Sequence, residues 1–216
     1  MPHTHITSPD IPAAADLRTF FDQAKPYDAY VSSAKPHEQS AWTAVRDRLT
    51  LTPAQLALLQ SFTRHLNILV LSGSWCGDCS AQVPMLDALA KAAPSNLVSL
   101  RILDRDAPPG DNQALAERVK ICGGLRVPTV LFLNEDFDFL VLMGDQTLSR
   151  LRAKARTQLG ATAAGAACDL PSASTAKTSI NAANDEIATL QDWLDALERA
   201  HLTARLSPKL RQRHGD

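Results

Sequence analysis

Two cysteines, Cys76 and Cys79, stand three positions apart in the segment Trp75-Cys76-Gly77-Asp78-Cys79. They follow an apolar run at residues 68–71 and precede a helical pattern that begins near Cys79. At such a junction the first sulfur lies over unpaired backbone N–H groups and the positive end of the helix dipole. That environment favours the thiolate, the form of cysteine that attacks disulfides. The pattern therefore indicates a redox pair, in which Cys79 can close a disulfide with Cys76.

A zinc site is the alternative interpretation, because zinc-binding cysteines use the same spacing. Such a site needs two further ligands, yet Cys122 and Cys168 are isolated and the six histidines show no ligand spacing. We therefore predict no metal and no other cofactor. We interpret Cys122 and Cys168 as buried or bystander thiols, since free cysteine packs as a small hydrophobic side chain.

Two prolines support the redox interpretation. Pro84 falls inside the helical pattern at residues 79–92, so it should kink that helix without ending it. Val127-Pro128 precedes the apolar run at residues 130–133, and proline is tolerated at the first residue of a buried strand. We expect a cis peptide bond before Pro128, which would place a turn beside the cysteines.

Together these motifs resemble the thioredoxin superfamily. The resemblance covers about residues 67–159 and rests on the cysteine segment, Pro84, residues 127–129 and Gly144. The cysteine segment at residues 75–79 and the segment at residues 100–106 resemble those of a bacterial thioredoxin-like subfamily. The resemblance implies an α/β fold, with a mixed sheet flanked by helices. It also implies that Pro128 faces Cys76 while the Val127 backbone pairs with an extended substrate segment.

Site roles follow from this resemblance. Cys76 attacks the target disulfide and Cys79 resolves the mixed disulfide. The substrate-binding residues are expected to be Trp75, Val127, Pro128 and Gly144. Gly77 and Asp78, between the two sulfurs, are expected to tune the redox potential.

Two carboxylate questions stay open at this point. The Asp78 carboxylate should raise the thiol pKa values, while the helix dipole acts in the opposite direction. The buried acid that thioredoxins carry six residues before the first cysteine is replaced here by Val70. Thioredoxin-like turnover would then need a substitute, for which Asp78 and Asp104 are the candidates.

The composition limits the classes of partner. The chain has 216 residues, 45% of them hydrophobic, and a net charge of −1, which suits one large domain or a domain with extensions. This charge gives no global signature of a nucleic-acid or membrane partner. No secretory signal and no apolar run long enough to span a membrane are visible, so we expect a cytoplasmic protein.

The pattern divides the chain into four segments. Residues 1–66 form a mobile arm and a helical extension, with a loop at residues 27–35 and a capping box formed by Thr52 and Gln55. Residues 67–159 form the redox domain. Residues 160–184 form a linker rich in Ala, Ser and Thr, and residues 185–216 form an amphipathic helix with a frayed basic tail.

Within the redox domain we predict strands at residues 68–71, 97–103, 129–133 and 137–143. We predict helices at residues 79–92, 112–121 and 145–159, the last with Leu148, Leu151 and Ala155 facing inward. The C-terminal helix carries the apolar stripe Ile187, Leu190, Leu194 and Leu197. We expect it to dock within the chain, on the N-terminal helices.

The function that these features favour is a thiol–disulfide oxidoreductase that reduces protein disulfides. Its partners would be disulfide-containing proteins and an unidentified electron donor. Two alternatives stay open: a disulfide oxidant or isomerase, and a redox-sensing or adaptor protein whose cysteine pair is a switch for a dedicated partner. The oligomeric state is also open.

Overall fold

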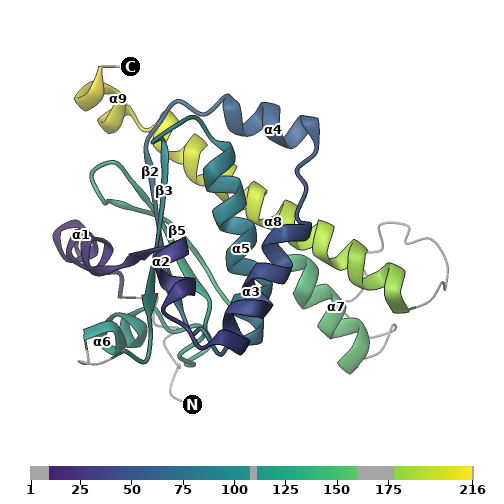
Figure 1. The fold of residues 1–216 in the computed structure, drawn as a ribbon. Coiled ribbons are helices and arrows are strands. Elements are labelled where there is room, and N and C mark those ends of the chain that lie inside the picture. The colour runs from purple at the N-terminus through teal and green to yellow at the C-terminus, as the bar shows by residue number, and fades with distance from the viewer. Residues whose placement is uncertain (1–9, 108–110, 160–177, 216) are drawn as a thin grey trace, which may run out of the picture.

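A computed structural model describes residues 10–107, 111–159 and 178–215 (Figure 1). Its helices are α1 (Ala14–Gln23), α2 (Tyr27–Ser32), α3 (Pro36–Arg48), α4 (Pro53–Gln60), α5 (Gly77–Ala92), α6 (Asp111–Arg118), α7 (Leu148–Leu159), α8 (Thr178–Leu206) and α9 (Pro208–His214). Its strands are β1 (Lys25–Pro26), β2 (Leu66–Ser72), β3 (Val98–Asp104), β4 (Thr129–Asn134) and β5 (Phe139–Met143). No helix in this part of the chain is long and apolar enough to cross a membrane.

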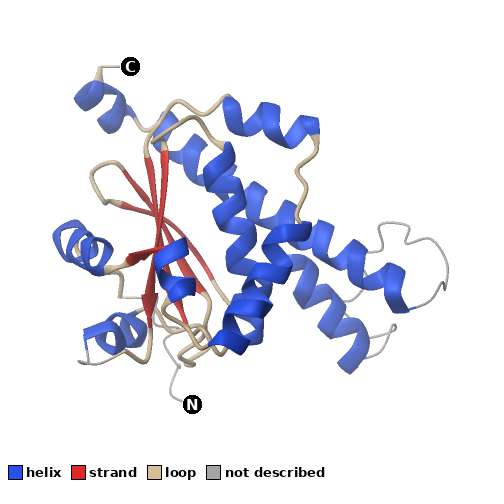
Figure 2. Cartoon of the chain, in the orientation of Figure 1, coloured by secondary structure: helices blue, strands red, loops and turns tan. Residues whose placement is uncertain are grey.

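The five strands form one mixed sheet in the order β1-β3-β2-β4-β5. Strands β2 and β3 run parallel, and the other neighbours run antiparallel. Helices lie on both sides of the sheet, with α1 and α6 on one side and α3, α5 and α8 on the other (Figure 2). The predicted α/β fold, a mixed sheet flanked by helices, is confirmed.

The central strand β2 is buried along its whole length. Ile68 and Val70 pack into the core shared with α5 and α8, while Leu69 and Leu71 pack into the core shared with α1 and α6. This alternation follows from the two-residue period of a strand. Because both faces of β2 are covered, the strand ends at a fixed position beneath the cysteine segment.

The N-terminal residues are part of this sheet. Lys25 and Pro26 pair with Ile102 and Arg101 of β3 as an edge strand. The predicted loop at residues 27–35 is wrong, because α2 occupies most of it and buries Tyr27 and Tyr30. The capping box at Thr52 is confirmed: its hydroxyl accepts from the Gln55 N–H at 3.3 Å.

The C-terminal helix α8 docks within the chain, but not mainly on the N-terminal helices. It packs on α5, α7, β4 and β5, and it buries Trp193, Leu194 and Leu197. The N-terminal helices add polar links, among them the ion pair between Arg48 and Glu186 at 2.8 Å. Ile187 was predicted in the buried stripe and is instead 64% exposed.

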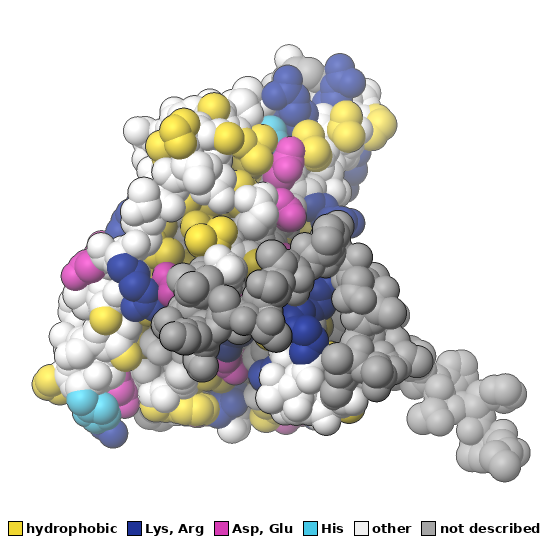
Figure 3. Space-filling view, turned by 90° about the vertical axis from the view of Figure 1, so that its right-hand side faces the viewer, with side chains coloured by type: hydrophobic (Ala, Val, Ile, Leu, Met, Phe, Trp, Pro, Cys, Tyr) yellow, Lys and Arg dark blue, Asp and Glu magenta, His cyan; other side chains and the backbone are white. Residues whose placement is uncertain are grey.

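Helix α7 does not have the inward apolar face that we predicted. Leu148 and Leu151 are 52% and 51% exposed, and the helix contains no buried residue. Its first turn is held by polar contacts instead, since the Ser149 N–H donates to Asp192 of α8 at 2.7 Å. Apolar side chains are visible among charged ones on the side of the molecule where α7 and α8 project (Figure 3).

Several elements also differ from the prediction in their bounds or structure. Helix α8 begins at Thr178, inside the predicted linker, whose earlier residues lie outside the described ones. The tail is not frayed: it forms α9, which buries Leu210 and pairs Arg213 with Asp136. Strand β5 begins at Phe139, because Phe137 has a φ of 65° in the preceding turn and packs on Phe21.

The predicted mobile arm, residues 1–12, lies mostly outside the described residues. Its described end is bound to α6, since Arg118 pairs with the Asp10 carboxylate at 3.2 Å. The larger division of the chain into four segments stays a prediction.

Candidate active site

Cys76 is the N-cap of α5, at the end of the short loop that leaves β2. Its sulfur accepts from the Cys79 N–H at 3.4 Å and lies 3.5 Å from the Val127 carbonyl oxygen, to which the thiol donates. The Cys76 N–H donates to the Gly73 carbonyl at 3.0 Å, which fixes the loop. Cys76 is partly exposed and Cys79 is fully buried, and both are free thiols. The site therefore presents one sulfur to solvent and keeps the other behind it.

The electrostatics of the pair separate the two thiols. The hydrogen bond from the Cys79 thiol, supported by the backbone N–H groups of Cys79 and Asp78, lowers the pKa of Cys76 to about 6. Burial and the Asp78 carboxylate act in the opposite direction but do not prevail. Burial, followed by the interaction with Cys76, raises the pKa of Cys79. The balance left open by the sequence thus favours a Cys76 thiolate.

Asp78 is paired with α7. Its carboxylate forms an ion pair with Arg150 and accepts from Gln146 Nε2 at 3.0 Å. The Arg150 charge offsets part of the repulsion that Asp78 exerts on a thiolate. Gly77, the other residue between the cysteines, is exposed and has open space where a Cβ would be.

Trp75 is a surface residue, 55% exposed. The Arg105 guanidinium lies 5.3 Å from the centre of its ring. Gly73 allows this packing, because a Cβ at residue 73 would lie 2.8 Å from the Trp75 ring. The result is an exposed aromatic ring on the residue that precedes Cys76.

The three other predicted substrate-binding residues have different surroundings. The Val127–Pro128 peptide bond is cis, as predicted, and the Val127 carbonyl contacts Cys76 directly. Gly144 packs against Ile121, whose Cδ1 would lie 2.5 Å from a Cβ at this position. Gln146, two residues after Gly144, links this segment to the cysteine motif through its hydrogen bond to Asp78.

The N-terminal helices reach the site, which the sequence did not predict. Trp42 of α3 is fully buried, and its indole N–H donates to the Ser74 carbonyl at 3.1 Å. Tyr30 of α2 packs on Trp42 with ring centres 5.5 Å apart. The spacing of residues in the sequence could not have identified these contacts, because more than 30 residues separate Trp42 from Ser74.

The other residues that the sequence analysis considered for a role in the site have the following surroundings. Val70 is buried at the position of the expected acid. Asp104 accepts from the Asp106 N–H at 3.0 Å in a local turn. Cys122 is exposed, which excludes the buried alternative and leaves the interpretation as a bystander thiol. Among the described residues no three His, Cys, Asp or Glu side chains are placed to hold a metal ion, and Cys168 lies outside this set.

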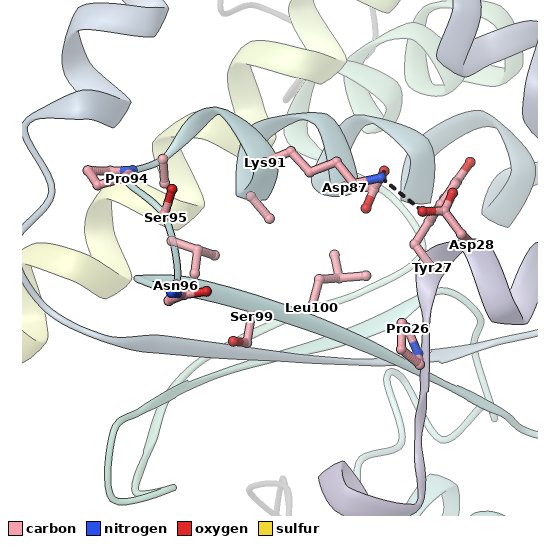
Figure 4. A pocket seen from close by; sticks show the side chains of 13 residues that line it. Pro26, Tyr27, Asp28, Asp87, Lys91, Pro94, Ser95, Asn96, Ser99 and Leu100 are labelled. Carbon is pink, nitrogen blue, oxygen red and sulfur yellow. Dashed lines mark hydrogen bonds and ion pairs between the residues drawn. The ribbon is translucent and has the colours of Figure 1, made fainter.

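A pocket of about 360 Å³ lies elsewhere, between the second half of α5, β3 and the start of α2 (Figure 4). Asp87, Lys91 and Asp28 line it, and Lys91 pairs with Asp28 at 3.4 Å and with Asp87 at 2.8 Å. Asp87 is ten residues from Gly77 on the same helix, or about 15 Å at 1.5 Å per residue. This pocket is therefore separate from the cysteines.

Comparisons with known proteins agree with this arrangement. The family model described as thioredoxin matches residues 24–146, more than half of the chain. No curated protein matches.

Two solved structures have a similar fold. One is a protein of unknown function from Pseudomonas aeruginosa, with a TM-score of 0.61 and 24% identity, covering 88% of this chain and 99% of that one. The other is an HIV epitope scaffold, with a TM-score of 0.57 and 23% identity, covering 84% and 96%. At these identities the structures show the shared fold alone. The family match and the cysteine site together establish that the chain belongs to the thioredoxin family.

Proposed function

We propose that this protein is a thiol–disulfide oxidoreductase that reduces protein disulfides through Cys76 and Cys79. The observation that carries the proposal is the asymmetric pair: a partly exposed Cys76 with a pKa of about 6, and a buried Cys79 in contact with it. The thioredoxin family supports a redox role in general. The specific activity is our proposal.

The reaction has two steps. The Cys76 thiolate attacks one sulfur of a substrate disulfide, forms a mixed disulfide and releases the other substrate sulfur as a thiolate. Cys79 then loses its proton and attacks the Cys76 sulfur, which forms the Cys76–Cys79 disulfide and releases the second substrate sulfur. Two electrons pass from the dithiol to the substrate, whose two thiolates take up protons. A thiol electron donor must then reduce the Cys76–Cys79 disulfide.

Two features beside Cys76 support a protein substrate. The exposed Trp75 ring offers apolar contact beside the reactive sulfur. The Val127 backbone lies next to Cys76, where an extended peptide could form main-chain hydrogen bonds. Main-chain recognition is independent of side chains, so it suits a range of disulfide-containing proteins. A cytoplasmic location, where dithiols are kept reduced, stays a prediction.

An insulin-reduction assay with dithiothreitol as the electron donor tests the proposal. We expect multiple turnovers for the wild type and for Cys122→Ser, which removes an exposed cysteine outside the pair. Cys76→Ser and Cys79→Ser should both abolish turnover. A single turnover per molecule would contradict the proposal and favour the redox switch. An equilibrium potential in the range of strong oxidants, measured in glutathione buffers, would favour an oxidant instead.

A further inference from the structure

The second step of the proposed reaction poses a chemical problem. Cys79 is fully buried, and burial raises its pKa, yet it must become a thiolate to attack the mixed disulfide. The position where thioredoxins carry a buried acid holds Val70, which is itself completely buried. Some other polar group must stabilise the charge that develops on Cys79.

Ser72 is placed to do this. It is the last residue of β2 and is fully buried, immediately before the loop that carries the cysteines. Its hydroxyl and the Gly73 N–H are near enough to the Cys79 sulfur to oppose the rise in the pKa of Cys79, in which burial dominates. In the resting dithiol the Ser72 oxygen makes no hydrogen bond of ordinary geometry with any described residue. A buried hydroxyl in this state is available to a partner that appears during the reaction.

Tyr30 lies behind Ser72. Its side chain is 3% exposed, its ring packs on Trp42, and the Ser72 hydroxyl is near enough to act on the pKa of its phenol. The Tyr30 oxygen also has no ordinary hydrogen bond among the described residues. Burial raises the pKa of Tyr30, and the carboxylates of Asp104 and Glu38 add to this effect. The phenol therefore stays protonated and serves as a donor.

We propose that Ser72 and Tyr30 form a hydrogen-bond donor chain that stabilises the Cys79 thiolate during resolution of the mixed disulfide. Ser72 donates to the Cys79 sulfur, and Tyr30 donates to the Ser72 oxygen. Ser72 is thus a catalytic residue in contact with a reacting atom, and Tyr30 is a positioning residue that acts through it. The inference rests on the proposed function and adds residues to its second step.

The chemistry balances without a further reactant. Cys79 first loses its proton to solvent, and its thiolate then attacks the Cys76 sulfur; the substrate sulfur departs as a thiolate and takes up a proton from solvent, while the two hydroxyl protons stay on their oxygens. A hydrogen bond to a charged acceptor is stronger than one to a neutral acceptor, so the chain stabilises the thiolate more than the thiol. The charged groups near the sulfurs include the Arg105 guanidinium and the Asp78 carboxylate, which is paired with Arg150.

The test uses the full chain with Cys122→Ser and Cys168→Ser, so that only the pair reacts. The reduced protein is mixed with an equimolar amount of Ellman's reagent in a stopped-flow instrument. Attack by Cys76 releases one thionitrobenzoate, and attack by Cys79 on the mixed disulfide releases the second. The two phases report the two steps separately. Cys79→Ser should lack the second phase.

Ser72→Thr and Ser72→Val are the matched variants. They have nearly the same shape, both suit a strand, and only threonine keeps the hydroxyl. We expect the second phase of Ser72→Val to be about tenfold or more slower than that of Ser72→Thr, in line with the loss of a hydrogen bond to a charged group. The first phase should stay within about twofold. Should the extra methyl group prevent folding, Ser72→Ala against the wild type gives the same comparison.

Tyr30→Phe and Tyr27→Phe form the second matched pair. Both tyrosines belong to α2, are 3% exposed and pack on Trp42, but Ser72 is among the groups that act on the pKa of Tyr30 and not among those that act on Tyr27. We expect Tyr30→Phe to slow the second phase by about threefold or more, because one indirect donor is lost, and Tyr27→Phe to leave it unchanged.

The outcomes separate the inference from the function on which it rests. Equal second phases in Ser72→Thr and Ser72→Val would overturn the role of Ser72. Equal slowing in the two tyrosine variants would overturn the role of Tyr30, because it would indicate a packing effect. A wild type without a rapid first phase would contradict the proposed function itself, and the inference with it.

Discussion

At the scale of single residues, the reactivity of Cys76 depends on which of two opposing influences is larger. Hydrogen bonds from Cys79 and from backbone N–H groups at the start of α5 stabilise its thiolate. Burial and the Asp78 carboxylate destabilise it. The result, a pKa of about 6, leaves Cys76 mostly ionised at neutral pH.

The first prediction concerns alkylation. Cys76 should react with iodoacetamide much faster than Cys79, with a rate that falls as the pH drops through about 6, because only the thiolate reacts. Mass-spectrometric mapping after brief alkylation at several pH values measures this. Equal labelling of the two cysteines, or a midpoint near that of an ordinary thiol, would contradict the assignment of roles.

The second prediction concerns the pairing of Asp78 with Arg150. Arg150→Ala removes the neutralising charge and should raise the pKa of Cys76, so that alkylation at pH 6 slows by about two- to fivefold. Asp78→Asn removes the repulsion and should lower this pKa. Arg152→Ala, on the exposed side of the same helix, is the control. The idea fails if Arg150→Ala and Arg152→Ala give the same pH profile.

The sequence predicted those parts of the site that local geometry determines. Cys76, Cys79 and Trp75 follow one another at a strand–helix junction, so their placement could be derived from the residues themselves. Arg150 lies 72 residues beyond Asp78, and Trp42 lies 32 residues before Ser74. Such contacts depend on how helices pack, which residue spacing does not encode.

At the scale of elements, α8 covers the side of the sheet on which α5 lies. It packs on α5, α7, β4 and β5, whereas α7 contains no buried residue. Both helices show an apolar stripe in the sequence, and a stripe alone does not indicate which helix is buried.

The third prediction tests this docking. Leu194→Ala should lower the free energy of unfolding by about 2–5 kcal/mol, because the side chain is 1% exposed and its removal leaves a cavity. Ile187→Ala is the matched control on the same helix, and its 64% exposure predicts a small effect. Urea denaturation followed by circular dichroism measures both. Similar losses for the two variants would show that the docked face is assigned wrongly.

At the scale of the whole molecule, residues from both ends of the chain complete the redox unit. The N-terminal segment supplies β1 to the sheet and Trp42 to the loop before Cys76. The C-terminal helix contacts that segment through His201, whose ring stacks on Phe62 with centres 4.2 Å apart and accepts from the Thr63 N–H at 3.1 Å. The two ends are therefore tied to each other as well as to the sheet.

The fourth prediction follows from His201. Burial, together with the charges of Arg205 and Arg64, lowers its pKa below the ordinary value of 6.5. The folded state therefore binds this proton less readily than the unfolded state, so its stabilisation is present above pH 6.5 and is lost as the pH falls. His201→Phe keeps a ring for stacking but cannot be protonated. Its melting temperature should fall less between pH 7 and pH 5 than that of the wild type, and an equal fall would contradict this role.

The division of labour between Cys76 and Cys79 is the central claim, and trapping of the mixed disulfide tests it most directly. Each variant, Cys79→Ser and Cys76→Ser, is incubated with a disulfide-bonded peptide in the Cys122→Ser, Cys168→Ser background and then analysed by intact mass spectrometry. Cys79→Ser should accumulate a covalent adduct on Cys76, because the attacking sulfur is present and the resolving sulfur is not. Cys76→Ser should accumulate little or none, because Cys79 is buried. Equal adducts on both variants, or an adduct only on Cys79, would contradict the account.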